Sequence, residues 1–357
     1  MRVGIVGLPN AGKSTLFNAL TRAGAETAPY AFTTIDPNVA VASVPDDRLR
    51  AVGETLGSSE LVPATIEFND IAGLVRGASR GEGLGNRFLG AIRETDAICH
   101  VVRCHADANV PHPEGRIDPM DDIETIEAEL LLADLEQTER RLERVVKKAR
   151  SGDKEAVAER DWLEAVRDAL AEGKPARSVP TPEGAPDAPR LLAALTSIPV
   201  LIAANVDEGV SEVPPEVAEH AVRTGAVAIA LSARLEAELG ELDGAEAAEM
   251  RAGLGVDASS LERLVRAAYE LLDLITFFTA DRDVEAWARS LRRGASAELA
   301  AAAVHTDLQR TFVRADVIGW DQLIEAGGWG GARERALIRT EGRSYVVQDG
   351  DVIHIRT

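Results

Sequence analysis

Cysteine is scarce in this chain, and long stretches of uncharged apolar residues are missing. The 357 residues include two cysteines, Cys99 and Cys104. Their neighbours Ile98, Val101 and Val102 are apolar, so we expect buried, reduced thiols rather than a disulfide. The mean hydropathy is −0.07, and without a long apolar run the sequence predicts no membrane span. Because the first residues already read as a strand, we expect no signal peptide and a cytoplasmic location.

Positive charge is also in short supply. The chain has 39 lysine and arginine residues against 59 aspartate and glutamate residues, which gives a net charge of −20. This balance argues against a polyanion-binding protein that relies on bulk charge. Residues 275–357 are nearly neutral, with 11 basic and 12 acidic residues. We therefore expect this C-terminal stretch to be the part that repels RNA least.

One complete motif stands near the start of the chain. Residues 7–15 read GLPNAGKST, which fits the phosphate-binding pattern G-x-x-x-x-G-K-[ST] between an apolar strand and a helical repeat. Backbone N–H groups of such a loop converge on phosphate oxygens at a helix N-terminus. The predicted phosphate-binding residues are Asn10, Ala11, Gly12, Lys13, Ser14 and Thr15. Lys13 is expected to reach the β- and γ-phosphates, and Ser14 to ligate Mg²⁺.

Two further segments have the chemistry of a metal and γ-phosphate site. Asp70 follows an expected strand, where its carboxylate can hold Mg²⁺ through water, and the N–H of Gly73 can meet the γ-phosphate. Thr34 lies in the preceding loop, where its hydroxyl can ligate Mg²⁺ when the γ-phosphate is present. We therefore predict metal ligation by Ser14, Thr34 and Asp70, with an ordinary loop threonine and an ordinary turn aspartate as the alternatives.

The residues expected to hydrolyse the nucleotide differ from those of Ras-like enzymes. Leu74 stands where those enzymes place the glutamine that orients water, so turnover should be slow. The residues that follow, 76–85, contain four glycines, which favours a mobile loop. His112, between two prolines, is a candidate for orienting water, and a plain surface histidine is the alternative.

The nucleotide base is expected to meet residues 205–208. GTPases usually have N-K-x-D here, whereas this chain has Val206 and Glu208 in place of the lysine and the aspartate. The longer carboxylate of Glu208 would misplace the bidentate hydrogen bonds to guanine. An asparagine amide such as that of Asn205 can instead pair with N6 and N7 of adenine. We therefore expect adenine, and guanine stays open as the alternative. Ser232 and Ala233 follow the next strand and read as a base-supporting loop.

The order of expected elements predicts an α/β protein with an insertion. Apolar residues between 131 and 170 follow a heptad-like spacing around Gly152-Asp153, which predicts an antiparallel helical hairpin of about 25 residues per arm. A stretch with five prolines, 175–189, reads as a connecting loop. Strands alternating with helical spacing predict a parallel sheet. The expected strands are residues 3–6, 39–44, 65–69, 97–103, 198–204 and 227–231.

The C-terminal stretch reads as a separate α+β module. A strand is expected at 275–278, a helix at 298–304, and a β-hairpin pairing 345–347 with 352–355 around Asp349-Gly350. The expected helix 261–272 closes the preceding domain. We thus expect a P-loop nucleotide-binding domain at 1–121 and 190–274, a hairpin at 122–189 and the C-terminal module at 275–357.

These motifs and their order resemble YchF-type ATPases, the Obg-like ATPase branch of the translation-factor GTPases. The matching segments are residues 7–15, 30–38, 70–88, 100–104, 205–208 and 349–352. The resemblance implies a C-terminal β-grasp (TGS) domain, a hydrophobic residue replacing the catalytic glutamine, and adenine contacts at Asn205 and Val206. It also places the proposed catalytic histidine of the family at His112. Asn10 matches an asparagine that binds K⁺ in some related hydrolases, with a plain loop residue as the alternative.

The resemblance further implies a function in translation or stress response. The partners would be the ribosome or its subunits, with rRNA or tRNA contacts through the C-terminal module and the hairpin. We expect a monomeric, Mg²⁺-dependent ATPase that acts as a slow molecular switch, with no membrane partner. Two alternatives stay open: an Obg-like GTPase switch, and an ATP-sensing regulatory or chaperone-like protein in which hydrolysis is secondary.

Overall fold

The described residues form two six-stranded sheets, each with its own helices. The computed structural model describes residues 1–27, 38–71, 84–107, 115–242, 244–254, 259–280 and 285–357. The chain divides into two compact units. The first comprises residues 1–20, 37–40 and 68–264, and the second comprises residues 21–36, 41–67 and 265–357. No helix in these ranges is both long enough and apolar enough to cross a membrane.

The first sheet has the strand order β2-β4-β1-β5-β6-β7. The neighbours β1, β5, β6 and β7 pair in parallel, as expected for a P-loop domain. β5 is buried along its whole length, and its sequence is apolar except for His100 and Arg103. The strands of this first sheet are β1 (Arg2–Val6), β2 (Val39–Ser43), β4 (Thr65–Asp70), β5 (Ala97–Arg103), β6 (Val200–Asn205) and β7 (Val227–Leu231). The six strands expected for this sheet are all present.

Helices of the first unit pack their apolar faces against this sheet. Phe88 and Ile92 of α3 and Ile126 of α4 share one buried cluster with Val6 and Ile98 of the strands. The cysteines are free thiols as predicted, and burial raises the pKa of Cys99 to about 12. The helices that lie wholly or partly in the first unit are α1 (Lys13–Thr27), α3 (Leu84–Arg93), α4 (Pro119–Ala149), α5 (Lys154–Ala171), α6 (Ala188–Leu192), α7 (Pro215–Thr224), α8 (Ala233–Leu239), α9 (Gly244–Gly253) and α10 (Ser260–Leu271); α1 and α10 extend into the second unit.

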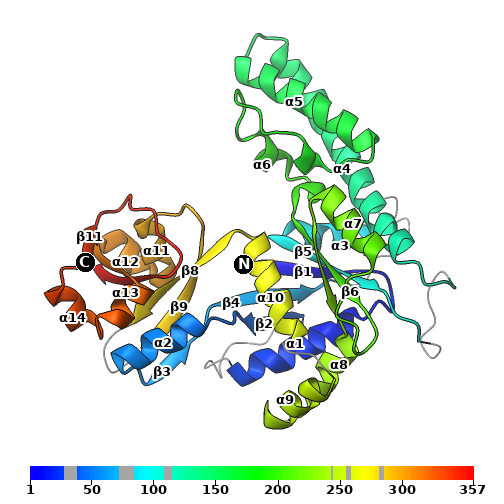
Figure 1. The fold of residues 1–357 in the computed structure, drawn as a ribbon. Helices are drawn as coiled ribbons and strands as arrows, with labels where there is room; N and C mark the ends of the chain where they lie inside the picture. The colour runs from blue at the N-terminus through cyan, green and yellow to red at the C-terminus, as the bar shows by residue number, and fades with distance from the viewer. Residues whose placement is uncertain (28–37, 72–83, 108–114, 243, 255–258, 281–284) are drawn as a thin grey trace. The chain divides into compact units, whose positions relative to one another are not determined.

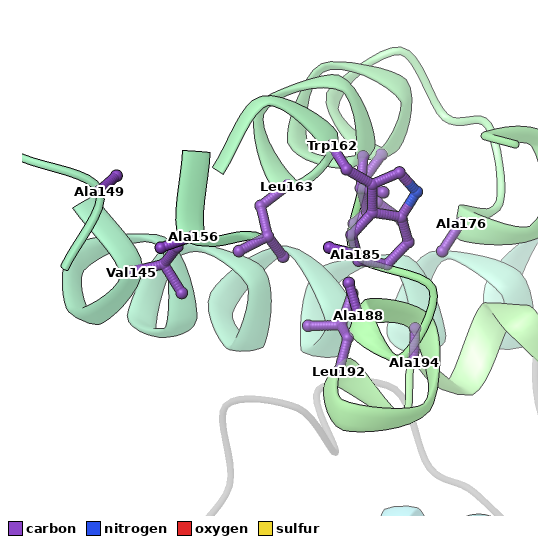
Figure 2. Packing of buried hydrophobic residues seen from close by; sticks show 12 residues of the cluster. Val145, Ala149, Ala156, Trp162, Leu163, Ala176, Ala185, Ala188, Leu192 and Ala194 are labelled. Carbon is purple, nitrogen blue, oxygen red and sulfur yellow. The ribbon is translucent and has the colours of Figure 1, made fainter. Parts of the chain in front are cut away.

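The predicted helical hairpin is formed by α4 and α5 (Figure 1). Its arms have 31 and 18 residues rather than equal lengths, because α4 continues down to the sheet, where Asp118 caps it. In Figure 2, Val145 of α4 lies beside Ala156 of α5, and the Trp162 ring lies near Ala185. The proline-rich connection therefore packs onto the hairpin, with short helical turns at Ala176–Ser178 and Leu195–Ser197.

A buried carboxylate fastens the hairpin to the connection that returns to the sheet. Asp134 of α4 accepts hydrogen bonds from the backbone N–H groups of Leu195 and Thr196, both at 2.8 Å. The Thr196 hydroxyl donates a third bond at 2.7 Å. Several charge-assisted bonds at one buried group fix local geometry, so the base of the hairpin is held in a defined position.

The second sheet has the order β11-β10-β12-β8-β9-β3. β10 pairs antiparallel with both β11 and β12, while β12 pairs in parallel with β8. The strands are β3 (Glu60–Val62), β8 (Leu274–Ala280), β9 (Glu285–Arg292), β10 (Arg314–Gly319), β11 (Arg339–Glu341) and β12 (Asp351–Arg356). Its helices are α2 (Asp47–Leu56), α11 (Ala297–Val304), α12 (Thr306–Thr311), α13 (Trp320–Glu325) and α14 (Trp329–Glu334). The predicted α+β architecture is confirmed.

The predicted β-hairpin between 345–347 and 352–355 is wrong. The turn at Asp349-Gly350 exists, with Gly350 at φ 87°, but β12 pairs with β10 and β8 instead. Val346 makes only an isolated antiparallel bridge to Ser296. Local alternation predicted a short-range partner, whereas β10, more than 30 residues earlier, offers six paired positions.

The second unit also contains a segment from the first quarter of the chain. β3 pairs in parallel with β9, placing Glu60 opposite Glu285. The Arg48 guanidinium of α2 donates to Asp349 Oδ2 at 2.7 Å and is held by Asp46. Asp349 Oδ1 in turn accepts a bond from the N–H of Thr276 at 2.9 Å. The Asp349-Gly350 turn is therefore tied both to β8 and to α2.

Candidate functional site

A pocket of about 820 Å³ lies in the first unit, where β1, β6 and β7 end and their loops begin. This is the edge at which parallel α/β sheets bind ligands, and the volume suits a nucleotide-sized molecule. The lining residues are Asn10, Gly12, Lys13, Ser14, Thr15, His105, Ala106, Asp107, Asn205, Val206, Asp207, Glu208, Ser232, Ala233 and Arg234. The pocket thus brings together the predicted phosphate-binding and base-binding segments from opposite ends of the domain.

The residues 7–15 loop adopts a backbone that depends on glycine. Gly12 has φ 102°, and a Cβ atom there would lie 2.3 Å from Asn205 Nδ2. Asn10 has φ 64°, a left-handed conformation that asparagine tolerates. α1 begins at Lys13, and Leu16 N donates to Gly12 O at 2.9 Å. The first turn of α1 therefore starts directly at the pocket, as an anion site at a helix N-terminus requires.

Lys13 is folded back onto its own loop. Its side chain is 8% exposed, and Nζ donates to Leu8 O at 2.9 Å. Burial lowers the pKa of Lys13, while the nearby Asp70 carboxylate opposes that shift. The lysine therefore lies in the pocket, close to an acidic group at the end of β4.

Asp70 has the properties expected of a residue near a metal ion. Among the described residues, its buried Oδ1 atom has no hydrogen-bond partner, while its N–H donates to Asn38 O at 2.9 Å. A buried carboxylate oxygen without a partner is costly unless a cation or a metal-bound water satisfies it. The residues thus fit Mg²⁺, which typically takes few protein ligands and completes its shell with phosphate oxygens and water.

Several predicted site residues lie outside the described residues: Thr34, Gly73 and His112, together with Leu74. Within the described ranges, no group of three or more His, Cys, Asp or Glu residues is placed to hold a metal ion. A Mg²⁺ ion here would depend instead on the Ser14 hydroxyl, on Asp70 and on oxygens of the nucleotide.

Asn205 connects the two ends of the pocket. It is 4% exposed, its Nδ2 donates to Ala11 O at 3.0 Å, and its Oδ1 accepts from the N–H of Ala233 at 3.0 Å. Nδ2 also lies 3.4 Å from His105 Nε2. The amide therefore braces the phosphate loop against the loop after β7, a role that the sequence did not predict.

The remaining residues predicted to contact the base line the other end of the pocket. Val206 is buried with Ala204 and Ala230, so it contributes mainly an apolar surface. Glu208 Oε1 lies 3.5 Å from Nε of Arg234, which also pairs with Glu238 at 2.9 Å. Ser232 caps α8 by accepting a bond from Leu235 N. The Glu208 carboxylate thus already faces a cation.

Three pocket residues after β5 were missed by the sequence interpretation. His105, Ala106 and Asp107 line the pocket, and the buried Arg103 guanidinium holds this loop by donating to His105 O at 3.2 Å and Asp107 O at 3.1 Å. Burial, followed by the charge of Arg103, lowers the pKa of His105. The rule that located Asn205, the carboxyl end of a buried parallel strand, also applies to these residues.

His100 lies on β5 beside Val6, the last residue of β1. It is 3% exposed, and its Nε2 has no hydrogen-bond partner among the described residues. Burial, with smaller contributions from His220 and Lys13, lowers its pKa to about 3. The imidazole is therefore neutral in the folded protein at ordinary pH.

The neutral state of His100 predicts acid sensitivity. The pKa of His100 in the folded protein is below its unfolded value of about 6.5, so the unfolded state binds the proton first as the pH falls. The contribution of the neutral imidazole to the free energy of unfolding is therefore fully present above pH 6.5 and is lost progressively as the pH falls toward 3. Between pH 7 and pH 4.5 this residue should lower the free energy of unfolding by about 2 to 3 kcal/mol. Urea unfolding of the wild type and a His100→Leu variant at both pH values tests this. Parallel pH profiles of the two proteins would contradict it.

Comparison with known proteins assigns the family. Residues 2–148 match the family model described as "50S ribosome-binding GTPase", and residues 274–357 match the YchF-GTPase C-terminal model, described as "Protein of unknown function (DUF933)". The chain is 47% identical over 363 residues to "Ribosome-binding ATPase YchF" of Bacillus subtilis, covering 100% of this chain and 99% of the relative. The chain belongs to the YchF family. The predicted family resemblance is thereby confirmed.

Other YchF proteins are similar over the same extent. "Ribosome-binding ATPase YchF" of Haemophilus influenzae is 48% identical over 359 residues, covering 99% of this chain and 98% of the relative. The solved "Structure of the Schizosaccharomyces pombe YchF GTPase" has a TM-score of 0.88 at 33% identity, covering 100% of this chain and 97% of the other. The P-loop fold and the C-terminal α+β module of YchF proteins therefore both occur in this chain.

Proposed function

We propose that this chain is a Mg²⁺-dependent ATPase that associates with the ribosome and acts as a slow molecular switch in translation or stress response. The observation that carries the proposal is the continuous pocket joining a P-loop to residues 205–208, in a chain matching proteins named ribosome-binding ATPases along its whole length. In such a switch the nucleotide state, rather than the hydrolysis product, is the output.

Each end of the pocket supports a distinct step. Lys13 and the backbone N–H groups of residues 10–15 hold the phosphates, and Ser14 with Thr34 ligates Mg²⁺, which neutralises charge on the phosphates when bound. Asp70 supports the ion through water, and its partnerless Oδ1 atom favours this role. Gly73 supplies an N–H group to the γ-phosphate. Asn10 is proposed as a contact for K⁺.

The base end favours adenine over guanine. Guanine recognition by a carboxylate needs that group to accept N1–H and N2–H₂ in a bidentate pair, whereas Glu208 already faces Arg234 at 3.5 Å. One Nδ2 hydrogen of Asn205 is already donated to Ala11 O, and Oδ1 already accepts from the N–H of Ala233. An adenine contact at Asn205 must therefore use the second amide hydrogen and the second lone pair of Oδ1. The apolar Val206 covers the base, and Ser232 and Ala233 support it.

A thermal-unfolding series with ATP and with GTP, each with Mg²⁺, tests the base assignment. We expect ATP to stabilise the protein by about 2.7 kcal/mol at one hundred times its Kd, and GTP to stabilise far less at the same concentration. A Val206→Lys, Glu208→Asp double variant is the matched control, and its preference should move toward GTP. Stabilisation of the wild type by GTP alone would support the Obg-like GTPase alternative.

Turnover is proposed to be slow because Leu74 cannot hydrogen-bond the attacking water, leaving His112 as the proposed water-orienting group. If a hydrolysis-deficient chain kept its full cellular activity, the ATP-sensing regulator would be favoured instead. Because ribosomes lie in the cytoplasm, the proposal also places the protein there. The protein is further proposed to be monomeric. Its contacts with rRNA or tRNA are proposed to run through the hairpin and the C-terminal module.

A further inference from the structure

The end of the α4–α5 hairpin is strongly basic in a chain whose net charge is −20. Between residues 140 and 154 there are seven basic and two acidic residues. We call six exposed members of this group the basic tip: Arg140, Arg144, Lys147, Lys148, Arg150 and Lys154. The seventh, Arg141, is paired with Glu159 across the two helices. The basic tip therefore reverses the sign of charge found over most of the protein.

Four of these side chains share one face of α4. Arg140, Arg144, Lys147 and Lys148 follow helical spacing and are all exposed. Val145 and Ala149 lie on the opposite side of the helix, where they pack against α5 (Figure 2). At 1.5 Å per residue the stripe from Arg140 to Lys148 is about 12 Å long. Duplex DNA carries one negative charge per about 1.7 Å of axis, so a stripe of this length spans several phosphates of a nucleic-acid duplex.

Pairing within the chain does not neutralise this charge. Arg140 meets Glu136 at 3.5 Å and Lys148 meets Asp153 at 3.2 Å, and exposed pairs of this kind contribute little and exchange readily. Within the described part of the chain, Arg144, Lys147, Arg150 and Lys154 form no ion pair. Most of the basic tip therefore remains available to an external anion.

Stabilisation of the helix end explains only part of the cluster. Lys147 and Lys148 lie in the last turn of α4, where cations favour the helix dipole, and this effect fades within one turn. Arg140 and Arg144 lie further back. Lys154 is the first residue of α5, where a cation is disfavoured. The distribution of charge thus exceeds what the two helices need for their own stability.

We infer that the basic tip binds the phosphate backbone of RNA, and that it is the surface through which the hairpin contacts ribosomal RNA. This inference rests on the proposed ribosome association. Residues 140–154 contain no aromatic residue; Val145 and Ala149 are buried, Leu142 and Val146 are half-buried, and no large hydrophobic side chain of this stretch is exposed. The surface therefore lacks the apolar anchors of protein interfaces but has the point charges that hold phosphates without reading bases. Binding is then independent of base sequence and sensitive to salt.

A charge-reversal variant of the full chain tests the inference. The variant Arg144→Glu, Lys147→Glu, Arg150→Glu changes three exposed members that have no ion pair within the described ranges. The matched control, Arg50→Glu, Arg223→Glu, Arg266→Glu, changes the net charge equally at exposed positions outside both the hairpin (122–189) and the C-terminal module (275–357). Both are measured against purified ribosomes and against protein-free ribosomal RNA, with helical content and ATP hydrolysis as checks on folding.

We expect the tip variant to bind both probes at least about tenfold more weakly than the control at moderate salt. Its slope of log affinity against log salt should fall by about 2 to 3, since three phosphate contacts are lost. A loss with intact ribosomes alone would identify an acidic protein as the partner and overturn the inference, as would equal losses in the control. If tip-dependent RNA binding persisted while the wild type ignored ribosomes, the proposed function would fail and the inference would stand.

Discussion

Replacing Lys13 by methionine is expected to reduce kcat for ATP hydrolysis by at least about a hundredfold, because a preorganised cation at the transferring phosphate is lost. The fold should survive. Leu8 O, which accepts from Nζ at 2.9 Å, also accepts from Ala11 N at 3.3 Å. Removing a buried cation whose pKa is lowered by desolvation also relieves an unfavourable burial. Phosphate release under saturating ATP and thermal unfolding without nucleotide measure the two effects.

A Lys13→Arg variant is the matched control for charge. The planar guanidinium keeps the positive charge but does not fit the buried position of a compact ammonium, so we expect hydrolysis to remain low. Wild-type turnover in Lys13→Met would show that this lysine does not stabilise the phosphates, and would favour a different site for the nucleotide.

Removing the Asn205 side chain is expected to weaken both the fold of the first unit and its affinity for nucleotide. Asn205→Ala leaves the carbonyl of Ala11 and the N–H of Ala233 without their partner in a buried position. Losing two such bonds should lower the free energy of unfolding by about 2 to 4 kcal/mol. Affinity for ATP should also fall, because the phosphate loop and the loop after β7 are no longer held together. Urea unfolding and nucleotide titration measure the two changes.

Ser232→Ala is the control for this prediction. Ser232 lines the same pocket and caps α8 through a bond to Leu235 N at 3.4 Å, but it does not join the two loops. Loss of an N-cap costs about 1 kcal/mol. The brace would be ruled out as a main determinant if Asn205→Ala cost no more than Ser232→Ala.

The sequence predicts the nucleotide pocket well because its information is local. A strand, a glycine-dependent turn and a helix start within 15 residues, and the rule that ligands meet the carboxyl ends of parallel strands places Asn205 at the same edge. The bracing role of Asn205 was not predictable, because it depends on a contact across 194 positions. The loop around His105 has no motif of its own, but it follows the predicted strand 97–103, so the same rule could have placed it at this edge.

The α4–α5 hairpin was also predictable from the sequence, since heptad spacing directly reflects which side chains pack. The basic cluster at its end was not predicted. Net charge over large blocks identified residues 275–357 as the stretch that least repels RNA, while the basic tip lies within the strongly acidic part of the chain. Averaging concealed a cluster that occupies only 15 positions, and spatial grouping on one helix face revealed it.

Strand pairing in the second unit was the least predictable feature. Val352 and Ile353 were expected to pair with nearby residues, yet they pair with Ile318 and Val317 of β10. β3 and α2 were not assigned to the C-terminal sheet at all, because nothing in residues 47–62 encodes a partner more than 200 residues away. Non-local pairing of this kind is decided by the whole sheet rather than by local pattern.

The membership of α2 and β3 in the second unit has a consequence for biosynthesis. Synthesis proceeds from the N-terminus, so these elements emerge long before β9, the strand that β3 joins. Until then the apolar face of α2, formed by Leu49, Val52 and Leu56, has no sheet to cover it. Residues 47–62, which contain α2 and β3, lie in the sequence between the proposed metal ligands Thr34 and Asp70. Truncated products that end before β9 would therefore leave this apolar face of α2 exposed.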